Sequence, residues 1–321
     1  MEREPNTLME AVRYFSDADR TLETMVSLRW PTGVHCPTCG RMDVRFIATR
    51  RIWECKETHA RRQFSAKVGT IFEDSALPLD KWFVAIWSVA NCKNGISSYE
   101  LGRAIGITQK SAWHMLHRIR LAMQTGSFIK FTGEAEADES YLGGSTRFMH
   151  KERRERALAA QNATLSDKSV VMGVLERNSA KSHSRVRLRH IRDANAKNIQ
   201  GHVRSSVEIC ARLLTDSALS YRALGGEYVH EFVNHAVEYV KGTVHTNGIE
   251  NFWSLLKRTI KGTYVSVDPV HLSAYLDEQS FRFNERKDND LGRFRKALKG
   301  IVGRRLTYAE LTGHAASEAA A

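Results

Sequence analysis

Four residues near the N-terminus have the types and spacing of a zinc site. Two residues separate Cys36 from Cys39, and Gly40 follows; this spacing is typical of a tight turn that presents two thiolates to one metal ion. With Cys55 and His59 as further ligands, the sequence predicts structural Zn²⁺ in a Cys3His site without an open position for substrate. The alternative is two reduced thiols beside a turn, with His59 in solvent. A segment of about 35 residues buries too little apolar surface to fold unaided, which favours bound metal.

Three acidic residues far apart in the sequence are candidate ligands for catalytic metal ions. Asp138 and Asp216 each end a predicted strand, and Glu250 lies in a predicted helix. Two divalent ions, Mg²⁺ or Mn²⁺, activate the attacking oxygen and stabilise the leaving oxygen in phosphodiester chemistry, and they need carboxylates from different elements. We therefore expect these three side chains to converge. Each also has a structural interpretation: a solvated strand end, a turn residue, and the capping-box partner of Asn247.

Three neighbours on the predicted helix could assist Glu250. Asn247 and Lys257 share a helix face with Glu250 by spacing, so Asn247 is a possible further metal ligand and Lys257 a phosphate contact. Arg258 is a further candidate DNA contact. Asn247 and Lys257 could equally be capping and solvent residues. We favour Glu250 as the third acid because it alone carries the needed charge.

Residues 97–123 have the outline of a helix-turn-helix. A capping box at Ser97 opens a short helix, Gly106 turns the chain, and Thr108 caps a longer helix that ends at Met123. Side chains that could donate to phosphates and base edges are expected to be exposed on this second helix: Gln109, Lys110, His114, His117, Arg118 and Arg120. The alternative is that the apolar residues of these helices only pack a three-helix bundle.

Hydrophobic periodicity and turn residues predict the elements that position these groups. Helices are expected at 8–27, 79–90, 195–205 and 250–261, and strands at 44–47, 51–54, 63–65, 134–138, 169–175, 186–190 and 211–216. Glu134, Glu136 and Asp138 would share one strand face. The segment 143–167 is rich in charged and polar residues and is expected to be a loop or mobile insertion. Alternating strands and helices indicate a multidomain α/β protein.

The net charge favours a polyanionic partner such as nucleic acid. The 48 Lys and Arg residues exceed the 36 Asp and Glu residues, which gives a net charge of +12. The excess is concentrated in a predicted basic tail, and Arg293 and Arg295 are its candidate DNA contacts within the span Arg282–Arg305. Three of the five cysteines cluster early, which suggests metal in a reducing compartment. We find no signal peptide or membrane span and expect a cytoplasmic, nucleoid-associated protein.

These motifs together resemble the bacterial insertion-sequence transposases that join an N-terminal zinc ribbon to an RNase H-like DDE domain, the ISXO-like family. The resemblance covers most of the chain and rests on Trp30-Pro-x-Gly-x-x-Cys36-Pro-x-Cys39-Gly40, Arg62-Gln-Phe-Ser65, Gly69-Thr-Ile-Phe-Glu-Asp74, Asp138-Glu-Ser-Tyr-Leu-Gly-Gly144, Thr215-Asp216 and His245-x-Asn247-x-x-Glu250-x-x-Trp253-x-x-x-Lys257-Arg258. Many relatives carry another cysteine after the one that matches Cys55, and here His59 takes its place.

The resemblance implies a function and a domain plan. Asp138, Asp216 and Glu250 would form the metal-binding triad for Mg²⁺- or Mn²⁺-dependent cleavage of element ends and strand transfer, by a homo-oligomer on double-stranded DNA. The predicted segments are a helical segment (1–28), a zinc ribbon (29–75), a helix-turn-helix-like domain (76–128), an RNase H-like catalytic domain (129–290) and the basic tail (291–321). The competing functions are a DNA-binding regulator with an inactive RNase H-like domain and an RNase H-like nuclease without strand transfer.

Overall fold

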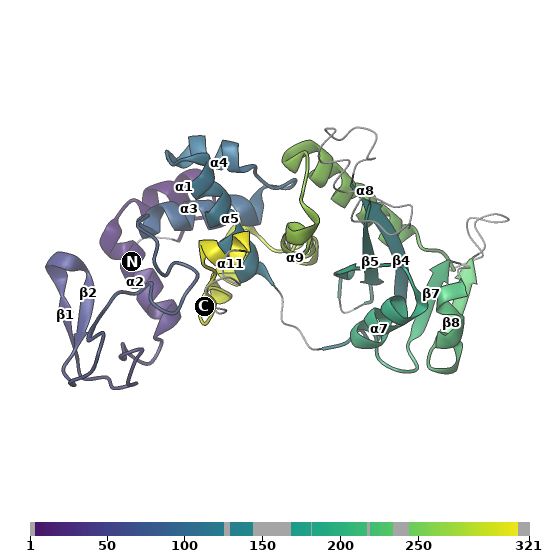
Figure 1. Cartoon of the computed structure of the whole chain (residues 1–321), viewed down its shortest axis with the longest axis horizontal. Helices are drawn as coiled ribbons and strands as arrows, with labels where there is room; N and C mark the ends of the chain where they lie inside the picture. Colours follow the sequence, from purple (N-terminus) through teal and green to yellow (C-terminus); the bar gives the residue numbers. More distant parts are fainter. Residues whose placement is uncertain are drawn as a thin grey trace. The chain divides into compact units, whose positions relative to one another are not determined.

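The computed structural model of the chain describes residues 4–124, 129–143, 168–180, 182–216, 219–233 and 244–313 (Figure 1). The chain forms two compact units, the first of Met1–Gln124 with Asp288–Ala321 and the second of Thr125–Lys287. Apart from Gly143, the insertion predicted at 143–167 lies outside the described residues. Within the described ranges, no helix is both long and apolar enough to cross a membrane.

The first unit begins with two helices and a small antiparallel sheet. Its first elements are α1 (Leu8–Phe15), α2 (Ala18–Arg29), β1 (Val44–Ile47), a 3-10 turn (Ala48–Arg50), β2 (Ile52–Cys55) and β3 (Gln63–Phe64). The strands pair in the order β1-β2-β3. The rings of Trp30, Trp53 and Phe64 pack edge-on or stacked beside this sheet and form its small apolar core. The predicted strands are confirmed to within one residue at each end.

Three further helices of the first unit follow the sheet. They are α3 (Leu79–Asn91), α4 (Ser98–Ile105) and α5 (Gln109–Met123). The predicted capping box is confirmed, because Ser97 accepts from the backbone of Glu100 and the Glu100 side chain accepts in return. Gly106 has a φ of 64°, which a glycine adopts at low cost, and Thr108 caps α5. The predicted sequence of helix, glycine turn and helix is therefore present.

The C-terminal segment returns to this unit instead of extending as a separate basic tail. It contains α10 (Asp290–Lys299) and α11 (Tyr308–Thr312). Phe294 of α10 is buried and its ring contacts the rings of Phe15, Phe83 and Trp87. The described part of the predicted tail thus contributes to the core of the first unit. The sequence suggested a basic tail because nine Lys and Arg residues face only three Asp and Glu residues between Phe281 and Arg305.

The second unit is a five-stranded mixed sheet. Its strands are β4 (Ala135–Leu142), β5 (Ser169–Glu176), β6 (Arg185–Ile191), β7 (Arg212–Asp216) and β8 (Val229–Val233), in the order β6-β5-β4-β7-β8. β5 runs antiparallel to β4 and to β6, whereas β7 runs parallel to β4 and to β8. β5 is apolar along nearly its whole length because both of its faces are covered. The predicted mixed α/β unit is confirmed.

Helices cover both faces of this sheet (Figure 1). They are α7 (Ala196–Ser206), α8 (Asn247–Thr259), which continues into a π turn (Ile260–Tyr264), and α9 (Leu272–Asn284), with 3-10 segments at Leu219–Gly226 and Pro269–His271. Ile199 and Val203 of α7 pack into the core on one face. On the other face, Phe252 and Trp253 of α8 pack with residues of α9. The pattern of apolar residues thus fixes which side of α8 faces the sheet and which side stays exposed.

Candidate functional site

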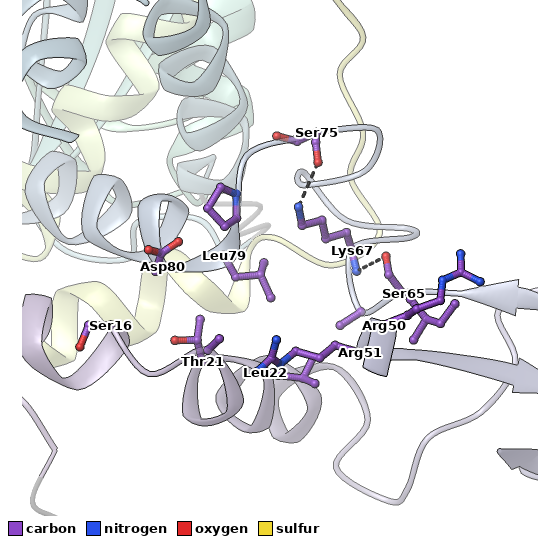
Figure 2. A pocket seen from close by; sticks show the side chains of 14 residues that line it. Ser16, Thr21, Leu22, Arg50, Arg51, Ser65, Lys67, Ser75, Leu79 and Asp80 are labelled. Atoms are coloured by element: carbon purple, nitrogen blue, oxygen red, sulfur yellow. Dashed lines mark hydrogen bonds between the residues drawn. The ribbon is translucent and has the colours of Figure 1, made fainter. Parts of the chain in front are cut away.

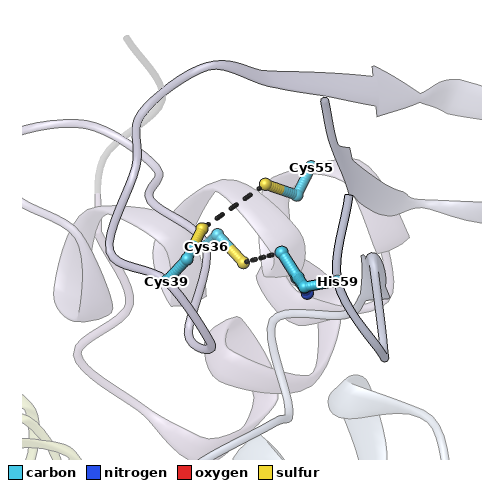
Figure 3. A group of neighbouring side chains, drawn as sticks. All are labelled: Cys36, Cys39, Cys55 and His59. Atoms are coloured by element: carbon cyan, nitrogen blue, oxygen red, sulfur yellow. Dashed lines mark hydrogen bonds between the residues drawn. The ribbon is translucent and has the colours of Figure 1, made fainter. Parts of the chain in front are cut away.

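The predicted zinc ligands lie together in the first unit (Figure 3). The ligand atoms of Cys36, Cys39, Cys55 and His59 all lie within 4.8 Å of one another. Tetrahedral zinc separates two thiolates by about 3.8 Å and a thiolate from an imidazole nitrogen by about 3.6 Å. The observed distances are 3.6 Å from Cys39 Sγ to Cys55 Sγ and 3.5 Å from Cys36 Sγ to His59 Nε2. The four residues therefore fit a closed tetrahedral site.

Hydrogen bonds prepare two of these side chains for a metal ion. Nδ1 of His59 lies 2.6 Å from the carbonyl oxygen of Ala60, which only accepts, so Nδ1 carries the proton and the lone pair of Nε2 faces the thiols. Burial alone would raise the pKa of Cys36, but backbone N–H groups of Cys39 and Thr38 lower it to about 7. The thiolate, which is the ligand form, is thus favoured at neutral pH.

The three predicted acidic residues line one pocket of the second unit. Its volume is about 310 Å³, and its walls are Asp138, Glu139, Ser140, Asp216, Thr246, Glu250, Trp253, Ser254 and Lys257. Asp138 and Asp216 lie on neighbouring parallel strands, one residue beyond the last paired positions, Ala137 and Thr215. Glu250 comes from the first turn of α8. Among the described residues, only the Cys3His group is drawn together as closely as bound metal requires, so the acidic pocket is the wider of the two sites.

Asp138 on β4 lies beside Gly173 and the indole ring of Trp253. Its partner across the β4–β5 pair is Gly173, and a Cβ atom there would come within 2.6 Å of the Trp253 ring. The indole therefore lies close to the strand, and its Nε1 donates a 2.8 Å hydrogen bond to Oδ2 of Asp138. Burial raises the pKa of Asp138 to about 6, and the charges of Asp216 and Glu250 act in the same direction. The indole N–H opposes this increase.

Glu250 is held by the residue that precedes α8. The Thr246 hydroxyl donates a 2.9 Å hydrogen bond to Oε1 of Glu250. The expectation that Asn247 caps this helix was wrong by one residue, because Thr246 is the N-cap and Asn247 is the first helical residue. Asn247 is exposed and is not among the residues that line the pocket, whereas Lys257 is exposed and lines it. Arg258 is also exposed.

Glu139 is a pocket residue that the sequence did not single out. We expected the chain to leave the strand after Asp138, but β4 continues to Leu142 and keeps Glu139 in the sheet. Burial raises the pKa of Glu139 to about 7, with the charges of Asp138 and Asp216 adding to the increase and a hydrogen bond with Tyr221 opposing it. Its only sequence signal was its position next to Asp138.

Arg118 and Arg120 were expected to be exposed on α5, and the structure corrects this. Arg118 is 5% exposed, and its guanidinium donates to the carbonyl oxygens of Leu306 (2.8 Å), Ile71 (3.1 Å) and Glu73 (2.7 Å). Arg120 is 1% exposed. The reason is that α5 packs against α3, α4 and α10 and is therefore a central helix of the first unit.

Only the beginning of α5 is exposed. Lys110 is exposed and lies over the ring of Tyr308, with its Nζ 4.8 Å from the ring centre. His114 is half-buried and meets the same ring edge-on. His117, which was also expected to be exposed, is buried. Gln109 donates a hydrogen bond to Ser98 Oγ.

The basic residues predicted as a DNA-binding tail have partners within the protein. Arg293 donates to Oδ1 of Asn91 at 2.7 Å, and Arg295 pairs with Glu4. Arg282 is 7% exposed and pairs with Glu278 in the second unit. Of these three, Arg295 keeps the most exposed side chain. The high count of basic residues in this segment therefore overstates the positive charge available to DNA.

A second pocket lies in the first unit (Figure 2). Its volume is about 490 Å³, and its lining includes Arg50, Arg51, Lys67 and Asp80. Lys67 donates to the carbonyl oxygens of Ser75 and Leu77, and Arg51 pairs with Asp19 at 2.6 Å. Arg51 thus ties the turn between β1 and β2 to helix α2, whereas Lys67 holds the loop that precedes α3.

Comparison with known proteins gives two domain matches and one relative. The model of the ISXO2-like transposase domain matches residues 130–284, and that of the transposase zinc-ribbon domain matches residues 16–61. A Halobacterium salinarum protein described as an uncharacterized protein in transposable element ISH50 is 25% identical over 278 residues, which cover 84% of this chain and 91% of that protein. The segment matched by the transposase domain contains the acidic pocket, and the segment matched by the zinc-ribbon domain contains the Cys3His group.

Proposed function

The chain belongs to the ISXO2-like family of insertion-sequence transposases, and we propose that its second unit cleaves DNA at element ends and joins those ends to target DNA. One observation carries the proposal: Asp138, Asp216 and Glu250, from two strands and a helix, line a single pocket. The strand order β6-β5-β4-β7-β8 supports an RNase H-like arrangement, in which the acidic residues follow adjacent central strands.

The acidic pocket fits Mg²⁺ or Mn²⁺, because its carboxylates are the hard oxygen ligands that these ions prefer. Burial, and to a smaller extent the charges of Asp216 and Glu250, raise the pKa of Asp138, so a bound cation would favour its ionised form. Bound ions would supply Lewis-acid activation of the attacking and leaving oxygens. In this site Asp138, Asp216 and Glu250 would be ligands, Trp253 would orient Asp138, and Lys257 would contact a phosphate.

DNA binding is assigned to the first unit and to the rim of the pocket. The zinc ribbon and the helix-turn-helix of α4 and α5 support recognition of element ends, with Lys110 at the exposed start of α5 as the phosphate contact. Lys257 and Arg258 would hold DNA at the pocket. Since transposition brings two element ends together, we expect a homo-oligomer on DNA.

A product assay tests this function and separates it from the alternatives. The substrates are labelled duplexes made from the DNA that flanks the gene on each side, together with an unlabelled target plasmid. The proposal predicts nicked ends and joined products with Mg²⁺ or Mn²⁺, and neither product with Asp138→Asn, Asp216→Asn or Glu250→Gln, whereas end binding persists. Cleavage without joining would indicate a nuclease. Binding without either reaction in the wild-type protein would indicate a regulator.

A further inference from the structure

We propose that Glu136 is a positioning residue that fixes Glu250 by capping helix α8 from the neighbouring sheet. This inference rests on the proposed function of Glu250 as a metal ligand. Glu136 lies on β4, two residues before Asp138, and is 1% exposed. Its Oε2 accepts a 2.8 Å hydrogen bond from the backbone N–H of Ile249, in the first turn of α8.

The first turn of α8 needs this acceptor. The first N–H groups of a helix lack partners within the helix, and an N-cap side chain usually accepts from one of them. Thr246 makes no such bond, and its hydroxyl instead donates to Glu250. Glu136 therefore accepts the hydrogen bond that an N-cap side chain usually accepts, and its negative charge lies favourably at the positive end of the helix dipole.

Arg177 holds the Glu136 carboxylate in the required orientation. Its Nε donates to Oε1 of Glu136 at 2.7 Å, and its Nη2 donates to the carbonyl oxygen of His245 at 2.7 Å. Arg177 thus connects the carboxylate to the chain that leads into α8. The last residues before the helix and its first turn are both anchored to β4, the strand that carries Asp138.

Gly248 makes room for this contact. A Cβ atom at position 248 would lie 2.7 Å from Oε2 of Glu136, too close for a normal contact. A helix normally gains stability when glycine is replaced by alanine, so glycine here costs helix propensity. Close approach of Glu136 explains why a glycine is used in this first turn.

Two pairs of variants separate positioning from general stability. Glu136→Ala removes the cap. Glu134→Ala removes a carboxylate directly before β4 that also pairs with Arg177 but is not a partner of the Ile249 amide. Gly248→Ala adds the obstructing methyl group, and Gly201→Ala adds a methyl group to helix α7, where nothing lies within 4 Å. Glu136→Met, whose side chain has a similar length but no oxygen acceptor, serves in place of Glu136→Ala if the latter does not fold.

The first readout is the affinity for Mn²⁺ of the full-length protein without DNA, measured by calorimetry. Glu136→Ala and Gly248→Ala should each weaken Mn²⁺ binding by about 10- to 100-fold, as loss of an orienting partner does, while Glu134→Ala and Gly201→Ala stay near wild type. Adding Glu136→Ala to Glu250→Gln should cause little further loss, because both act through the same ligand. Hydrogen exchange of the peptide that contains Ile249 should accelerate in Glu136→Ala and Gly248→Ala alone.

The results distinguish this inference from the proposed function. If Glu250→Gln weakens Mn²⁺ binding but Glu136→Ala and Gly248→Ala do not, the positioning role is wrong and the metal site stands. Fully additive losses in the double variant would also contradict the positioning role. If Glu250→Gln itself leaves Mn²⁺ binding and cleavage unchanged, the proposed triad fails and the inference fails with it.

Discussion

The indole Nε1 of Trp253 donates a 2.8 Å hydrogen bond to Oδ2 of Asp138, so helix α8 directly holds the carboxylate on strand β4. The two residues are 115 positions apart in the sequence, and the absence of a side chain at Gly173 lets the indole approach. The same helix carries Glu250. This hydrogen bond thus connects the helix that carries Glu250 to the strand that carries Asp138.

Removing this hydrogen bond should change the pH dependence of cleavage. The indole N–H lowers the pKa of Asp138, so Trp253→Phe should raise that pKa above about 6. Because the ionised carboxylate is the metal ligand, the acidic limb of the rate profile should move to higher pH. Trp82→Phe, which also removes an indole hydrogen bond but lies in the first unit, is the matched control. An unchanged limb in Trp253→Phe would contradict this account of Asp138.

The acidic pocket should destabilise the second unit at high pH when no Mg²⁺ or Mn²⁺ is added. Asp138 has a folded-state pKa of about 6 against an ordinary 3.8, so ionisation is harder in the folded protein. The loss of folding stability that ionised Asp138 causes is absent at low pH, grows as pH rises above about 4, and is complete above about 6. Asp138→Asn should therefore increase stability at pH 8 by on the order of 1–3 kcal/mol, and hardly at pH 4. Thermal unfolding at both pH values measures this difference, and an equal effect at both would refute it.

Loss of zinc should unfold the β1–β3 sheet. Cys55→Ser removes a ligand and should change the fluorescence of Trp30 and Trp53, which pack beside this sheet. His59→Cys should keep the metal, because a fourth thiolate suits tetrahedral zinc. Cys92→Ser, outside the site, is the control. Metal analysis of the purified variants together with tryptophan emission gives the result, and wild-type protein that folds without metal would overturn the assignment.

Variants of Arg118 and Lys110 should affect stability and DNA binding separately, although both residues lie on α5. Arg118→Ala leaves three carbonyl groups without their donor and should lower the free energy of unfolding by about 2–4 kcal/mol. Lys110→Ala should leave stability nearly unchanged and reduce the salt dependence of DNA affinity by about one ion. Urea unfolding and binding at several salt concentrations measure the two effects. The opposite assignment of effects would show that α5 presents a different face to DNA.

Local signals in the sequence predicted those parts of the fold that local interactions determine. The capping box at Ser97, the glycine turn at Gly106 and the cap at Thr108 each involve residues a few positions apart, and all are present. The Cys36 knuckle and the apolar inner face of α8 follow from spacing in the same way.

Long-range partners determined the features that were missed. The buried guanidinium of Arg118 donates to carbonyl groups of Ile71 and Leu306, which are 47 and 188 residues away. The sequence around Arg118 does not predict such distant partners. Glu136 was assigned correctly to the strand face of Asp138, but its partner Ile249 is 113 residues away, so the sequence did not indicate that Glu136 contacts the start of α8. Strand β8 (Val229–Val233) was not predicted because the polar residues His230 and Glu231 interrupt its short apolar sequence.

The most direct test of the central claim is the metal preference of Asp138→Cys in the cleavage assay. A thiolate at this position binds Mg²⁺ poorly and softer ions such as Mn²⁺ better. If Asp138 is a metal ligand, the variant should be inactive in Mg²⁺ and recover part of its cleavage in Mn²⁺, while Asp138→Ala stays inactive in both. Equal wild-type activity of Asp138→Cys in both ions, or activity of Asp138→Ala, would contradict the assignment of Asp138 to the metal site.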